Sequence, residues 1–69
     1  MKYLIVIEKT KIGYSAFSPD VEGCVATDHT SENVENTMQE AIKFHLERLA
    51  LEGESTPEPH SYSKYLEVA

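Results

Sequence analysis

One long segment of the chain repeats its apolar residues at the spacing of a helix, and this feature limits the folds available to it. From Ser31 to about Glu52, apolar side chains recur three or four positions apart, which is typical of an amphipathic α-helix. They are Val34, Met38, Ala41, Ile42, Leu46 and Leu49. Thr30 suits the N-cap of this helix, and Gly53 suits the position just after its last turn. A helix with one apolar face must pack against another layer, which the remaining residues have to supply.

The segments before this helix have the composition and spacing of short strands. Residues 2–9 are rich in β-branched and aromatic side chains and are apolar on both faces, which predicts a central strand. Residues 14–18 alternate loosely and predict the return strand of a hairpin. Residues 24–29 predict a third strand, in which Cys24 and Ala26 share one face.

A last strand is predicted at residues 61–68, after a polar connector that contains two prolines. The element order is then β-β-β-α-β, and residues 1–69 form a single domain. The short links favour an antiparallel meander, with the amphipathic helix on one face and the last strand returning to the sheet. The predicted fold class is α+β.

The size and charge of the chain restrict what it can do. A domain of 69 residues is marginally stable alone, so we expect a homo-oligomer or a bound partner. Cys24 is the only cysteine, which excludes a disulfide within the chain and favours the reducing cytoplasm. A net charge of −6 disfavours direct binding to nucleic acid and suits a basic protein partner. The apolar run from Tyr3 to Ile7 is too short for a signal peptide or a membrane span.

The residues capable of chemistry do not form a catalytic or metal-binding motif. Asp28 and His29 are neighbours, so on a strand they point to opposite sides. The spacing of Cys24, His45 and His60 matches no zinc signature. We therefore expect no enzyme activity, no metal and no cofactor, and we expect Cys24 to be a buried structural thiol. His45 lies in the apolar stripe of the helix, where it is either hydrogen-bonded within the fold or in contact with a partner.

A second face of the predicted helix is a candidate interface. Phe44 and Leu51 lie seven positions apart, off the main apolar stripe. Together with Tyr62 and Tyr65 from the C-terminal segment, they are candidates for a contact between subunits. The alternative is that Phe44 and Leu51 are simply buried under that segment.

Taken in order, these residues resemble the HicB family (UPF0150) of type II antitoxins over nearly the whole chain. The family pattern is Y-x-A-x-x-P-D-x-x-G-C, then a Thr that opens a helix containing Glu-Ala, then L-x-x-x-G and Pro-x-Pro. The matching residues are Tyr14, Ala16, Pro19, Asp20, Gly23, Cys24, Thr30, Glu40, Ala41, Leu49, Gly53, Pro57 and Pro59. The resemblance implies a partial ribonuclease H-like fold without catalytic carboxylates. It also implies a non-catalytic protein that neutralises a small basic HicA-type toxin, itself a ribonuclease.

On this resemblance, acidic residues near the loop and the sheet rim are the expected toxin contacts. They are Glu8, Asp20, Glu22 and Asp28, with His29 beside them. Many family members have a glycine followed by an acid before the helix-opening Thr, whereas this chain has Asp28 and His29. Many members also continue into a DNA-binding domain, and the resemblance does not extend operator binding to these 69 residues.

Two other functions stay open on the sequence. One is an orphan homo-oligomeric module that binds a small ligand or another protein. The other is an enzyme, which would require a cleft lined by carboxylates.

Overall fold

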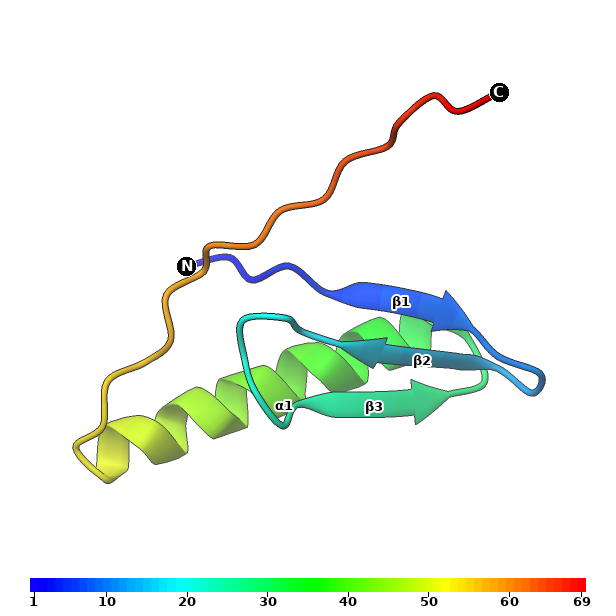
Figure 1. The fold of residues 1–69 in the computed structure, drawn as a ribbon. Helices are drawn as coiled ribbons and strands as arrows, with labels where there is room; N and C mark the ends of the chain where they lie inside the picture. Colours follow the sequence, from blue (N-terminus) through cyan, green and yellow to red (C-terminus); the bar gives the residue numbers. More distant parts are fainter.

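A three-stranded antiparallel sheet with one helix across a face makes up the fold (Figure 1). The computed structural model describes all 69 residues. Its elements are β1 (Val6–Lys9), β2 (Tyr14–Phe17), β3 (Val25–Asp28) and α1 (Ser31–Leu51). The strand order β1-β2-β3 confirms the predicted meander and the α+β class. For the second strand, the third strand and the helix, each predicted boundary lies within one residue of the observed one.

Helix α1 begins and ends where the sequence predicts. The side-chain oxygen of Thr30, the N-cap, accepts a hydrogen bond from a backbone N–H of the first turn at 3.0 Å. Gly53 has a φ of 73°, a left-handed conformation that glycine adopts without strain. The N–H groups of Gly53 and Glu54 donate to the carbonyls of Ala50 and Leu49. These two bonds satisfy carbonyls of the last turn that would otherwise lack partners.

A small apolar core lies between the sheet and the helix. Its buried members are Ala16, Val21, Cys24, Ala26, Val34, Met38 and Ile42. Ala16 and Ala26 are direct cross-strand partners, and their small side chains let the helix approach the sheet closely. Val21 comes from the loop between β2 and β3 and is fully buried, although the sequence gives this segment the character of an exposed loop. The predicted alternation of the third strand is confirmed, because Ala26 is buried while Val25 is exposed.

The first strand is shorter than predicted and lies at an edge of the sheet. Only Val6–Lys9 of the predicted strand 2–9 pairs with β2, and β1 has no strand on its other side. The prediction of a central strand is therefore wrong for the single chain. Pairing stops at Val6 because β2 ends at its partner Phe17. The next residue, Ser18, turns its side-chain hydroxyl to the Leu4 carbonyl at 2.8 Å instead.

The predicted last strand, residues 61–68, is not formed. After α1 the chain is extended, passes the N-terminal segment (residues 1–5) and then runs away from the sheet (Figure 1). The Tyr3 hydroxyl donates to the Pro57 carbonyl at 2.6 Å, which ties the connector to the N-terminal segment. A strand forms only where a neighbour can share backbone hydrogen bonds, and the tail (residues 61–69) has no such neighbour in its own chain.

Candidate functional site

A buried carboxylate in the loop between β2 and β3 holds the start of the tail. The Asp20 side chain is fully buried. Its Oδ2 accepts hydrogen bonds from the backbone N–H groups of His60 at 3.1 Å and Ser61 at 2.9 Å, and its Oδ1 accepts one from the Ser61 hydroxyl at 2.7 Å. The imidazole Nδ1 of His60 lies 3.2 Å from Oδ1. We call Asp20, His60 and Ser61 the tail clamp.

The electrostatics of the tail clamp favour the ionised form of Asp20. The hydrogen bonds from the Ser61 backbone and hydroxyl hold the pKa of Asp20 below its ordinary value of 3.8, and contacts with His60 act in the same direction. Burial of the carboxyl opposes this shift, but its effect is smaller. Both carboxylate oxygens are thus occupied within the chain. Of the two acidic residues that we predicted in this loop, only Glu22 is exposed.

At the opposite end of the sheet, Asp28 and His29 meet the β1–β2 hairpin. The His29 ring Nδ1 lies 3.3 Å from the Ile12 carbonyl oxygen, and the His29 backbone N–H donates to the Asp28 carboxylate at 2.7 Å. Residues of the hairpin and of the end of β3 line a cleft of about 450 Å³. Gly13 is required here because a Cβ at that position would collide with the Asp28 carbonyl oxygen. Asp28 is half-buried and His29 is exposed, so His29 is the more accessible of the two.

The outer face of α1 carries carboxylates beside apolar side chains. Phe44 is 71% exposed and Leu51 is 88% exposed, so the alternative of burial under the tail is wrong. Exposed glutamates, Glu40 and Glu47, precede them by four positions each. Residues four apart are neighbours on a helix surface, so these four residues form one patch, which we call the helix patch. The two glutamates were not among the predicted contact residues, although their spacing from Phe44 and Leu51 could have identified them.

Glu8 lies on the face of the sheet that the helix leaves open. It pairs across the ladder with Ser15, which in turn pairs with Thr27. Val25 stands on the same face, two residues from Thr27, and is 71% exposed. The predicted toxin contacts are therefore not gathered at one place. Glu8 lies on the open sheet face, whereas the other predicted contacts lie at the two ends of the sheet.

The cysteine and the helix histidine are engaged within the fold. Cys24 is buried as predicted, with its Sγ 3.9 Å from the Ala41 carbonyl oxygen. Burial raises the pKa of this thiol, and the positive charge of Arg48 opposes the shift only in part. His45 is half-buried, and its Nδ1 lies 3.1 Å from a guanidinium nitrogen of Arg48. Nowhere do three or more His, Cys, Asp or Glu side chains gather closely enough to hold a metal ion.

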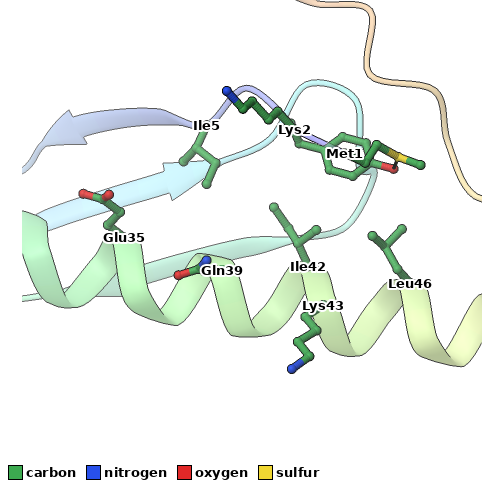
Figure 2. A pocket seen from close by; sticks show the side chains of 9 residues that line it. Met1, Lys2, Ile5, Glu35, Gln39, Ile42, Lys43 and Leu46 are labelled. Carbon is green, nitrogen blue, oxygen red and sulfur yellow. Dashed lines mark hydrogen bonds between the residues drawn. The ribbon is translucent and has the colours of Figure 1, made fainter.

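A larger cleft, of about 560 Å³, lies between the N-terminal segment and α1. Figure 2 shows Ile5 from the segment, and Ile42 and Leu46 from the helix, pointing into this space. Polar side chains, including Lys2 and Glu35, line its margin. Helix α1 itself has no stretch apolar enough to cross a membrane.

Comparisons with known proteins give a consistent assignment. The family of HicB-like antitoxins of bacterial toxin–antitoxin systems matches residues 3–68. An uncharacterized 14.9 kDa protein from the rep-hol intergenic region of Haemophilus phage HP1 (strain HP1c1) is 35% identical over 66 residues, which are 96% of this chain and 50% of that protein. The chain thus spans about half the length of this relative.

A solved structure is also similar. A chain of the HicA3 and HicB3 toxin–antitoxin complex matches with a TM-score of 0.71 and 33% identity, over 87% of this chain and 70% of that one. The family match, over residues 3–68, includes all three strands and the helix. The chain belongs to the HicB-like antitoxins of bacterial toxin–antitoxin systems.

Proposed function

We propose that the chain is a non-catalytic antitoxin that binds a small basic HicA-type toxin, an mRNA-cleaving enzyme, and occludes its working surface. The observation that carries this proposal is the likeness to a chain of the HicA3 and HicB3 complex, within a family of antitoxins. The net charge of −6 supports it, because an acidic surface attracts a basic partner and accelerates encounter. The cytoplasm, where the mRNA lies and where a free thiol stays reduced, is the proposed location.

The helix patch is the contact surface that we favour for the toxin. Phe44 and Leu51 offer apolar side chains that a partner can desolvate, and such anchors carry most of the energy of a protein interface. Glu40 and Glu47 stand beside them, as charged residues do at an interface rim. The patch therefore combines an apolar centre with the charge that a basic toxin requires.

The residues at the sheet are a second proposed contact. His29 and Asp28 border the hairpin cleft, and Glu8 and Glu22 are exposed on other parts of the surface. Asp20 differs from these, because its carboxylate is inside the protein and bonded by the tail. We therefore assign Asp20 to holding the tail, and we keep Glu8, Glu22 and Asp28 as sites for charge reversal.

Calorimetric titration with a HicA-type toxin, sought first in the adjacent gene, tests the proposal. We expect association at moderate salt, and we expect the double change Glu40→Lys, Glu47→Lys to weaken it about tenfold or more, since like charges then face a basic partner. Glu54→Lys with Glu58→Lys is the matched control, because it changes the net charge equally at exposed positions outside the patch. No association at moderate salt would refute the antitoxin function. An equal loss in the control would refute only the choice of the helix patch.

A further inference from the structure

Two stretches with the composition of strands have no strand partner in the single chain. Residues 2–5 lead into β1, and the run from Tyr3 to Ile7 is apolar on both faces like a central strand, yet the outer edge of β1 is free. In the tail, Tyr62, Leu66 and Val68 fall on one face of the extended backbone. They are 85%, 75% and 90% exposed. A free edge with unpaired N–H and C=O groups is a template for an incoming strand, and the tail is an extended segment with no strand beside it.

The single chain also exposes more surface than a folded protein of its mass. Its accessible surface is 5789 Å², whereas a compact monomer of 7.8 kDa exposes about 4,400 Å². Its radius of gyration is 13.6 Å, against about 11 Å for a compact chain of this length. It has 32 backbone–backbone hydrogen bonds, where about 45–50 are typical. If two chains each buried the excess, about 2,800 Å² would be covered in total, which is in the range of obligate homodimers.

The tail leaves the domain from a fixed point. Pro57 and Pro59 restrict the connector to an extended course, because proline fixes its own φ and limits the residue before it. The tail clamp then holds the chain at Ser61 through Asp20. Beyond the clamp, residues 62–69 run outward on the side of β1, away from the sheet (Figure 1). Eight extended residues reach about 26 Å, which is longer than β1.

We propose that the tail of each chain adds as a fourth strand to the free edge of β1 in a second copy, so that two chains form a strand-exchanged dimer. The added strand supplies the partner that β1 and residues 2–5 lack. Its apolar face then covers the cleft between the N-terminal segment and α1, which is lined by Ile5 and Leu46, both only partly buried in the single chain (Figure 2). The occupant of this cleft is the Leu66 and Val68 side of the tail of the second copy. The assembly does not depend on a toxin.

Sedimentation equilibrium and amide hydrogen exchange of the 69-residue chain test this proposal together. We expect a dimer in which the amides of residues 62–68 exchange at least about 100-fold more slowly than in an unstructured chain, because a ladder protects them. Dilution below the dissociation constant should remove this protection. A chain that is monomeric at all concentrations would overturn the proposal. So would a dimer whose tail amides exchange freely.

Two substitutions that add the same charge to opposite faces of the tail sharpen the test. Leu66→Asp should raise the dimer dissociation constant at least about 100-fold, because a dimer loses two buried leucines. Leu66→Ala should raise it about tenfold or more for the same reason. Ser63→Asp, on the other face, should change it less than about fivefold. Leu66 is exposed in its own chain, and a retained helical circular dichroism spectrum shows that the domain is still folded. Equal effects of Leu66→Asp and Ser63→Asp would overturn the proposal.

Discussion

Replacing Val21 by alanine should destabilise the protein far more than the same change at Val25. Val21 lies in the loop between β2 and β3 and is 0% exposed, whereas Val25 lies four residues later on the open sheet face and is 71% exposed. Both changes delete the same two methyl groups. The loop is held in place by hydrogen bonds of 3.3 Å from the Val21 N–H to Ser18 and from the Cys24 N–H to Val21. The comparison therefore isolates the contribution of burial in a loop.

The expected magnitudes follow from the two exposures. Two buried methyl groups contribute about 1.6 kcal/mol, at about 0.8 kcal/mol each, and the cavity left at Val21 adds about 0.5–1 kcal/mol. At Val25 most of the side chain is already in water, so the loss is about 0.5 kcal/mol, with a few tenths more for the lower strand propensity of alanine. A domain of this length has a total stability of about 3.5–10 kcal/mol. Val21→Ala should therefore remove a large share of it.

Urea unfolding followed by far-ultraviolet circular dichroism measures the difference. All variants should be compared at one protein concentration, because association makes the apparent stability depend on it. With a slope of about 1 kcal/mol per molar urea, the midpoint should fall by about 2 M for Val21→Ala and by less than about 1 M for Val25→Ala. Equal shifts for the two variants would refute the reasoning, since the loop would then not be part of the core.

The tail clamp, the hairpin and the helix N-cap set three other expectations. Because the folded pKa of Asp20 lies below its ordinary value of 3.8, the clamp contributes its full stability above that pH and loses it as the pH falls through the folded pKa. Hydrogen exchange of the Ser61 amide, corrected for its intrinsic rate, should accelerate as the pH falls through the folded pKa of Asp20. Asp20→Asn should remove this pH dependence. A corrected exchange rate of the parent protein that does not change with pH would contradict the role of the clamp. Gly13→Ala should cost about 1–3 kcal/mol, because its Cβ meets the backbone of Asp28, and a melting temperature within about 2 °C of the parent would contradict this. Thr30→Ala should cost about 1 kcal/mol and lower the melting temperature by about 4–8 °C, whereas Thr30→Ser, which keeps the cap, should lower it by less than half as much; equal losses would contradict the cap.

The helix could be predicted with both its ends, because the signals that define it are local. The apolar spacing sets its buried face, and the Thr30 hydroxyl and the left-handed Gly53 act within one turn of the ends. Such signals need no knowledge of the rest of the fold. The three short strands were located for a similar reason, since alternation along each one reports which side faces the helix.

The edges of the sheet could not be predicted in the same way. Residues 2–9 and 61–68 both have the composition of strands, yet residues 2–5 and the whole of 61–68 lack a ladder. Composition shows that a segment would suit a strand, but only the arrangement in space decides whether a neighbour is present. In the dimer proposed above, the unpaired tail of one chain and the free edge of β1 in the other would supply this neighbour to each other.

The burial of Asp20 also could not be predicted from the sequence. A Pro-Asp pair ordinarily marks an exposed turn, and the sequence analysis placed Asp20 among the expected toxin contacts. In the structure the connector after α1 returns to the loop, and His60 and Ser61 donate hydrogen bonds to the carboxylate. No residue close to Asp20 in the sequence indicates that its hydrogen-bond donors lie at least 40 residues later in the chain.

The reactivity of the Cys24 thiol can report how often the sheet and the helix separate. Its Sγ lies in the core beside the Ala41 carbonyl, and burial raises the pKa of the thiol, so the reactive thiolate is scarce in the closed fold. A thiol reagent can modify it only when sheet and helix separate, and the labelling rate then measures the free energy of that separation without an added probe. A disulfide-linked pair of chains on a non-reducing gel would accordingly record molecules that had opened, rather than the native association of two intact domains.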